Sequence, residues 1–140
     1  IQGYYDAYHN NNLCVDDALI IGDQFGLRNG YLETKRLLSA EHRPSALFAL
    51  SNIVCLGALR AIAEQGLKIP DDISIVSFDK IPYIDFFQKK ITYIEQPVEE
   101  MALVAFRVLA EQVEGGRTDE KLEIMLPVEF KKYHSVSTIK

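Results

Sequence analysis

Five polar or aromatic side chains in this sequence are of types that suit the binding of a hydroxyl-rich molecule. They are Phe25, Ser51, Asn52, Asp79 and Gln96. Carboxylates and amides form paired hydrogen bonds with neighbouring hydroxyl groups, and an aromatic face covers the apolar C–H side of such a molecule. We therefore predict that these five residues line a ligand site. Each has a structural alternative, since Asp79 could cap a turn and Ser51 or Asn52 could cap a helix.

The sequence lacks the patterns that catalysis, cofactor binding or metal binding usually require. It contains no G-x-G-x-x-G, G-x-x-x-x-G-K-[ST] or G-x-S-x-G motif. Neighbouring carboxylates diverge on a helix or strand, so the acidic doublets form no acid–base dyad; they are Asp16-Asp17, Asp71-Asp72 and Glu99-Glu100. There is no C-x-x-C and no histidine pair at helical spacing, so zinc ligation is not expected. We predict a protein that is not an enzyme and needs no metal or cofactor.

The composition and charge are those of a soluble globular domain. Of 140 residues, 48% are hydrophobic and 25% are charged, which is enough to bury a core. Fifteen basic against twenty acidic residues leave a net charge of −5, so this stretch does not itself resemble a nucleic-acid binder. No apolar run approaches the length of a membrane span, and no signal-peptide pattern opens the chain.

The two cysteines bear on the cellular compartment of the protein, and the first residue bears on how its chain begins. Cys14 and Cys55 allow one disulfide, but two cysteines in a domain of this size fit a reducing compartment better. We therefore expect a cytoplasmic protein without a membrane partner. Because the first residue is Ile1 and not Met, we expect either a fragment or a processed start.

Apolar spacing and turn residues predict an alternating series of helices and strands. We expect helices over Ile1–Tyr8, Gly30–Leu38, Ile53–Gln65 and Pro97–Val113. We expect strands over Ala18–Ile21, Ala46–Leu50, Ile73–Phe78, Ile91–Ile94 and Leu122–Leu126, and a last one within Val128–Tyr133. The continuous apolar run Ala46–Leu50 is typical of a strand that is buried on both faces.

This alternation predicts an α/β fold with a doubly wound, mainly parallel sheet and helices on both faces. In such sheets, ligands bind outside the carboxyl ends of the strands. Asp23–Gly26, Ser51–Asn52 and Asp79–Pro82 each follow a predicted strand. We therefore expect these three segments to share one rim of the sheet.

Three segments of the chain resemble the LacI/GalR family of bacterial transcription regulators. They run from Ala46 to Ala61, from Gly66 to Asp79 and from Ile91 to Met101. The string Ile-Pro-Asp-Asp-Ile-Ser, the Phe-Asp pair that follows it and the downstream Gln-Pro pair are jointly specific. The resemblance extends from Ile1 to about Ser137. It implies the C-terminal part of an effector-binding core with the type I periplasmic-binding-protein-like fold.

The resemblance also implies roles for the candidate residues. Asp79 matches the aspartate that binds effector hydroxyls, and Gln96 matches the glutamine at the crossover between the two subdomains. Phe25 falls where the family often has an aromatic residue over the ligand. Ser51 and Asn52 stand where the family usually has Asn-Asp, so the identity of the effector stays open.

The division of the chain between two lobes is a further implication of the resemblance. The subdomains of the family exchange chain at crossovers, which would lie near Gln96 and Pro127. Residues 1–95 and 127–140 would then belong to the C-terminal lobe, and residues 96–126 to the N-terminal lobe. The family places a helix-turn-helix headpiece and the first half of the core ahead of the segment that this chain resembles.

By this resemblance the chain is the effector-sensing and dimerisation portion of a LacI-type regulator. Its partners would be a small-molecule effector, which the resemblance implies is a carbohydrate, a second copy in a homodimer, and DNA only through the headpiece. The helix Ile53–Ala63 would form either part of the dimer contact or only core. Two alternatives stay open: a solute-binding protein of a sugar transporter with the same fold, and a Rossmann-like enzyme.

Overall fold

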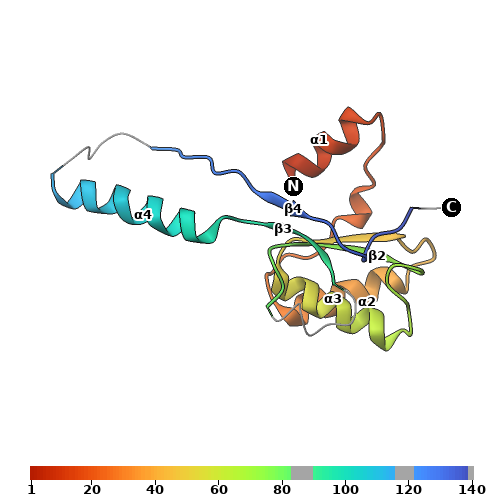
Figure 1. Ribbon diagram of the computed structural model, residues 1–140. Coiled ribbons are helices and arrows are strands. Elements are labelled where there is room, and N and C mark those ends of the chain that lie inside the picture. The colour runs from red at the N-terminus through yellow and green to blue at the C-terminus, as the bar shows by residue number, and fades with distance from the viewer. Residues whose placement is uncertain (83–89, 116–121, 139–140) are drawn as a thin grey trace.

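The computed structural model describes residues 1–82, 90–115 and 122–138, and these residues build a four-stranded sheet with helices on both sides (Figure 1). The strands lie in the order β1 (Ala46–Ala49), β2 (Ser74–Phe78), β3 (Thr92–Glu95) and β4 (Glu129–Lys131). The first three are parallel, and β4 runs antiparallel to β3. The prediction of a mainly parallel α/β fold is therefore confirmed.

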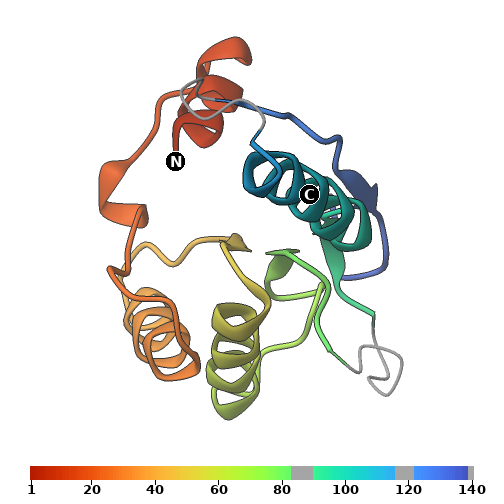
Figure 2. The ribbon, with the colours of Figure 1, turned by 90° about the vertical axis from the view of Figure 1, so that its left-hand side faces the viewer.

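The helices are unevenly packed around this sheet. The structure has α1 (Gln2–Asn10), α2 (Leu27–Leu38), α3 (Asn52–Glu64) and α4 (Val98–Val113), with one 3-10 turn at Asp17–Leu19. Helices α2 and α3 lie side by side on one side of the sheet, where α3 contacts β1 and β2, and α1 lies on the opposite side (Figures 1 and 2). In the ranges that the structure describes, no helix has both the length and the apolar composition to cross a membrane.

The pairing of α2 with α3 depends on two glycines. A Cβ atom on Gly30 would lie 2.3 Å from the carbonyl oxygen of Val54, and one on Gly57 would lie 2.1 Å from that of Leu27. Both distances are far below a van der Waals contact. The absence of side chains at these two positions therefore lets the two helix backbones touch.

The hydrophobic core lies between α3 and the sheet, and the C-terminal segment closes it. Ile62, Ile73 and Ile75 are almost fully buried. Ser135, also fully buried, accepts a hydrogen bond at Oγ from the Thr92 N–H at 2.8 Å and donates one to the Ile75 carbonyl at 2.6 Å. Since Ile75 is on β2 and Thr92 is on β3, this one side chain ties the starts of two neighbouring strands.

Helix α4 extends away from the rest of the molecule (Figure 1). None of its residues is buried, and Phe106 is 73% exposed. The helix follows the predicted pattern, with Glu99 and Glu100 in its first turn, where they complement the positive end of the dipole. Pro97 is its N-cap and not its first helical residue, so the predicted helix start is wrong by one position.

Three sequence-based expectations about strands are wrong. Ala18–Ile21 forms the end of the 3-10 turn and an extended stretch, and Leu122–Leu126 is not a strand either. A strand needs a neighbour to bond to, and none of the described residues pairs with either segment. The strand predicted at Ala46–Leu50 exists, but it is at the edge of the sheet and is not buried on both faces, because Phe48 is 44% exposed.

Candidate functional site

The backbone at Asp79 has a conformation that few side chains tolerate. Asp79 follows β2 directly, and its φ angle is +74°. Aspartate is among the residues that adopt this left-handed region most readily. Its N–H donates a hydrogen bond to the carbonyl oxygen of Ile94 at 3.0 Å. Asp79 is thus fixed to the neighbouring strand β3, with its side chain half-buried at the carboxyl end of the sheet.

Gln96 lies at the same end of the sheet, because β2 and β3 are parallel neighbours. Phe78 pairs with Ile94, so the residues that follow these two strands are adjacent. The side-chain amide of Gln96 donates a hydrogen bond to Oδ1 of Asp79. The structure thus brings Asp79 and Gln96 together at the carboxyl ends of neighbouring parallel strands. Asp23–Gly26, which was expected on the same rim, follows a segment that is not a strand.

Asn52, which comes after β1, also lies at this rim, whereas Ser51 has a structural role. The Asn52 side-chain amide donates to the carbonyl oxygen of Lys80, 3.2 Å away. Asn52 is thereby tied to the residue after Asp79. Ser51 is the N-cap of α3, and its Oγ accepts a hydrogen bond from the Val54 N–H at 3.2 Å. The structure therefore confirms the alternative in which Ser51 caps a helix.

Phe25 is separate from these contacts. It precedes Gly26, the N-cap of α2, and its side chain is 80% exposed. The prediction that its ring covers a ligand stays a prediction.

Asp79 and the nearby carboxylate Glu95 have different side-chain partners in the part of the chain that the structure describes. Lys131 on β4 places its Nζ 3.4 Å from Glu95 Oε2 and 2.5 Å from Glu129 Oε1. The hydrogen bond to Glu129 is the main reason why the pKa of Lys131 lies above its ordinary value. Among the described residues, the side-chain partner of Asp79 is the neutral amide of Gln96, and a carboxylate can also accept hydrogen bonds from hydroxyl groups.

The rim also contains backbone groups that sequence reasoning missed. The carbonyl oxygens of Lys80 and Ile94 hold Asn52 and Asp79 in place. Nothing in the residue types indicates these roles, because every residue has a backbone carbonyl group. Across the described residues, no group of three or more histidine, cysteine, aspartate or glutamate side chains is placed to hold a metal ion.

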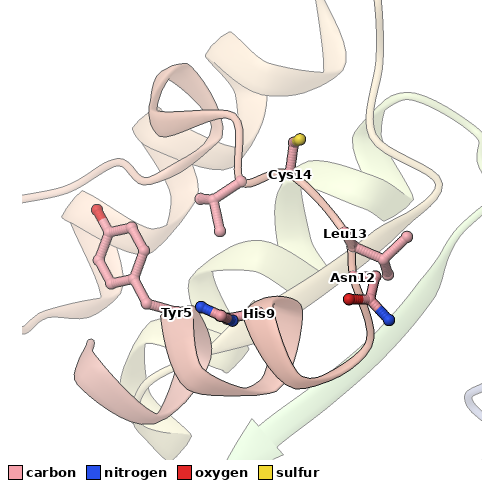
Figure 3. Close-up of a pocket in the computed structure, with 6 residues that line it drawn as sticks. Tyr5, His9, Asn12, Leu13 and Cys14 are labelled. Carbon is pink, nitrogen blue, oxygen red and sulfur yellow. The ribbon is translucent and has the colours of Figure 1, made fainter.

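A hollow of about 460 Å³ lies between α1 and the turn that follows it (Figure 3). It is lined by Tyr5, His9, Asn12, Leu13, Cys14 and Val15, none of which the sequence analysis selected as a ligand residue. The Tyr5 hydroxyl donates to Asp17 Oδ1 at 2.9 Å, and this hydrogen bond raises the pKa of Tyr5. Because the lining contains no carboxylate, the rim at Asp79 is the better candidate for a hydroxyl-rich ligand.

Comparison with known proteins places the chain in a family. Residues 1–136 match the family described as "Periplasmic binding protein-like domain". The chain is 32% identical over 121 residues to the HTH-type transcriptional repressor PurR of Serratia proteamaculans, which covers 86% of this chain and 36% of that protein. It is 37% identical over 109 residues to the HTH-type transcriptional regulator MalR of Clostridium butyricum, covering 78% and 32% respectively.

A solved structure shows the same fold. The crystal structure of a LacI family transcriptional regulator from Enterococcus faecium, with bound ribose, superimposes with a TM-score of 0.83 and 28% sequence identity. The match covers 99% of this chain and 51% of that one. The chain thus spans about a third of the length of the curated relatives that it matches. The chain therefore belongs to the LacI/GalR family, and its residues 1–136 match the periplasmic binding protein-like domain.

Proposed function

We propose that this chain is the effector-sensing and dimerisation portion of a LacI-type transcription regulator, and that its effector is a small hydroxyl-rich molecule, a sugar. The observation that carries this proposal is the gathering of Asp79, Gln96 and Asn52 at the carboxyl edge of three parallel strands. The ribose in the Enterococcus faecium relative supports a sugar as the class of effector.

In this proposal the sugar is bound and released without reaction. The Asp79 carboxylate accepts hydrogen bonds from two neighbouring hydroxyls, the amide of Asn52 donates and accepts at the next position, and Phe25 covers the apolar face of the ring. Ser51 fixes the start of α3 and so the position of Asn52. No side chain is assigned a catalytic role.

The names of the relatives support a proposal for how this chain acts within the whole protein. Both curated relatives are named as HTH-type regulators, and we propose that DNA is bound through a helix-turn-helix segment outside these 140 residues. The net charge of −5 fits this division, since a DNA-binding surface needs excess positive charge. We further propose a cytoplasmic homodimer. Because the matched relatives are transcription regulators, the solute-binding protein of a transporter is not the favoured alternative.

The exposed face of α4 supports the proposed division into lobes. Leu103, Phe106 and Leu109 are all more than half exposed, and such a stripe normally lies against a partner surface. We propose that residues 96–126 belong to the N-terminal lobe and that residues 1–95 and 127–140 belong to the C-terminal lobe. The sugar would bind between the two lobes and change their relative orientation.

A thermal-shift screen of the full-length protein tests the proposed class of effector. Ribose, glucose, cellobiose and sucrose form one set, and purine bases form a second set. A ligand that binds only the folded protein stabilises it by about 2.7 kcal/mol at a hundred times its dissociation constant. We expect a sugar to raise the melting temperature. A rise with purine bases alone would reject the sugar, and a rise with neither set would reject the proposal.

A further inference from the structure

The turn that carries Asp79 is held on both sides of Lys80. Before Lys80, the Asp79 N–H donates a hydrogen bond to the Ile94 carbonyl oxygen at 3.0 Å. After Lys80, the side chain of Ile81 is buried in the hydrophobic core and is only 1% exposed. Between these two points, Asp79 has a φ angle of +74°, which is unfavourable for a residue with a side chain. The turn therefore keeps this conformation because contacts around it hold it there.

The carbonyl oxygen of Lys80, in the middle of this turn, accepts a hydrogen bond from the side-chain amide of Asn52 at 3.2 Å. Asn52 is the first residue of α3, and its place is well fixed. The preceding residue, Ser51, caps the helix by accepting a hydrogen bond from the Val54 N–H, and α3 packs against α2, β1 and β2. The Asn52 amide thus holds the turn from a rigid part of the molecule.

The contact between Asn52 and Lys80 requires a hydrogen-bond donor at position 52. A carbonyl oxygen only accepts hydrogen bonds, and the amide of asparagine supplies an N–H for it. An ionised aspartate at this position would have acceptors only, so its oxygens would repel the Lys80 carbonyl oxygen. A leucine has nearly the shape of asparagine but no polar group. Asparagine, aspartate and leucine at position 52 therefore separate the loss of the donor from a change of size.

We propose that Asn52 is a positioning residue that acts through Asp79. By holding the Lys80 carbonyl, it keeps the Asp79 carboxylate in the geometry that accepts sugar hydroxyls before the sugar arrives. A preorganised carboxylate loses less conformational freedom on binding, and the affinity is higher for that reason. The inference rests on the proposed function, since it takes Asp79 as the effector contact. It is compatible with a contact between Asn52 and the sugar, because the amide has a second N–H and an oxygen.

Hydrogen–deuterium exchange with mass spectrometry tests the turn in the full-length protein without sugar. In Asn52→Leu and in Asn52→Asp, we expect peptides that contain residues 78–81 to exchange about two- to tenfold faster than in the parent protein. Peptides from α2 should exchange as in the parent, which shows that the fold is kept. If Asn52→Leu exchanges faster throughout the chain, the result of Asn52→Asp decides. Parent-like exchange of residues 78–81 in a folded variant would overturn the proposal.

Asn11→Leu is the matched control for the exchange experiment. The Asn11 side-chain amide also donates to a backbone carbonyl oxygen, that of Ala7, at 2.8 Å at the end of α1. The substitution therefore removes the same kind of hydrogen bond at a place that has no contact with the Asp79 turn in the described chain. Residues 78–81 of this variant should exchange at the parent rate. Equally fast exchange in Asn11→Leu would show that the effect is not specific to Asn52, and would overturn the proposal.

Calorimetry with ribose then separates positioning from direct contact. If Asn52 holds the turn, Asn52→Leu and Asn52→Asp should both weaken ribose binding by about two- to tenfold. If Asn52 acts only by contacting the sugar, Asn52→Asp keeps acceptors for hydroxyl groups and should bind ribose as tightly as the parent or more tightly. That result, together with weaker binding by Asn52→Leu, would overturn the proposal.

A double-mutant cycle with Asp79→Asn shows whether Asn52 acts through the carboxylate. We expect Asn52→Leu to weaken ribose binding clearly less in the Asp79→Asn background than in the parent, because the group that Asn52 positions is already absent. The same fold-change in both backgrounds would contradict action through Asp79. Absence of ribose binding to the parent contradicts the proposed effector class, whereas the exchange experiment still decides whether Asn52 holds the turn.

Discussion

The side-chain amide of Gln96 donates a hydrogen bond to Oδ1 of Asp79, across the ends of the parallel neighbours β3 and β2. This contact joins the one rim carboxylate without a cationic partner in the described chain to the residue that leads into α4. It rests on a backbone with a positive φ angle at Asp79. A substitution of Asp79 therefore changes both ligand binding and the strain of the backbone. Separate variants are needed to measure these two effects.

Asp79→Asn and Asp79→Ala distinguish the effect of losing the carboxylate charge from the effect of placing a less tolerant residue at a positive φ angle. Both changes remove the charge, and we expect each to weaken sugar binding to the full-length protein by about 1.5–3 kcal/mol, as for a charged hydrogen bond. Asparagine tolerates the left-handed region, whereas alanine there costs roughly 1–2 kcal/mol more, so only Asp79→Ala should lower the melting temperature clearly. Calorimetry and thermal melts check both effects. Unchanged affinity in both variants would remove Asp79 from the site.

Gly30→Ala and Gly57→Ala test the close approach of α2 and α3. The new Cβ atoms would collide with the carbonyl oxygens of Val54 and Leu27, and we expect each variant to lose about 1–3 kcal/mol of unfolding free energy. Gly3→Ala is the control, because nothing lies within 4 Å of a Cβ atom there. That change should stabilise α1 by about 0.5–1 kcal/mol. Similar denaturation midpoints for all three variants would contradict the packing described here.

Ser135→Ala and Ser137→Ala form a matched pair within the C-terminal segment. Ser135 is fully buried and its Oγ serves both Thr92 and Ile75, so its loss leaves buried backbone groups without a partner. We expect a cost of about 1–3 kcal/mol. Ser137 is exposed and its Oγ donates only to the Pro70 carbonyl, which predicts a change within about 0.5 kcal/mol. Equal effects in urea titrations would show that the buried bridge adds no stability.

The two cysteines should differ strongly in reactivity. Cys14 is exposed, whereas burial raises the pKa of the Cys55 thiol to about 12. At pH 8 only about one Cys55 thiol in ten thousand is ionised. A thiol reagent followed by peptide mapping should therefore modify Cys14 and leave Cys55 intact until the protein unfolds. Rapid modification of Cys55 in the native protein would contradict its burial.

The same shift predicts how stability changes at high pH. The Cys55 thiol keeps its proton in the folded protein up to a pKa of about 12, whereas the ordinary value is 9.0. Above pH 9 the unfolded chain therefore loses this proton first, and the free energy of unfolding falls as the pH rises toward 12. In Cys55→Ala this part of the pH dependence should disappear from denaturation curves measured between pH 8 and pH 11.

Ile53→Glu tests the proposed role of α3 in dimerisation. Ile53 is 43% exposed, whereas Leu56 is half-buried and packs against the core. We expect Ile53→Glu to raise the dimer dissociation constant at least about tenfold without unfolding the protein. Leu56→Glu should instead unfold it. Sedimentation and circular dichroism distinguish these outcomes, and a fully dimeric Ile53→Glu protein would exclude this part of α3 from the interface.

The sequence predicted the elements whose cause is local. The apolar run before Asp79 and the cap at Ser51 before α3 depend on nearby residues, and the structure has both. The meeting of Asp79 and Gln96 was predictable as well, because parallel neighbouring strands end at the same edge. In the case of Asn52, the residue type and its place after a strand were enough to suggest a position on the rim.

The expectations that are wrong depend on residues distant in the sequence. Ala18–Ile21 and Leu122–Leu126 have apolar patterns typical of strands, but strand formation also needs a neighbour, and sequence spacing does not supply one. The exposure of Phe48 follows from the edge position of β1, which local pattern does not indicate. Ser135 bonds to Thr92 and Ile75, which lie 43 and 60 positions before it, so no local pattern predicts this bridge.

A crystal structure of the full-length protein, with the sugar that gives the largest thermal shift, tests the central claim most directly. The account predicts sugar hydroxyl oxygens within about 3 Å of the Asp79 carboxylate and a sugar that is chemically unchanged. A sugar bound elsewhere with Asp79 still paired to Gln96 alone, or a sugar cleaved or modified in the site, would contradict it.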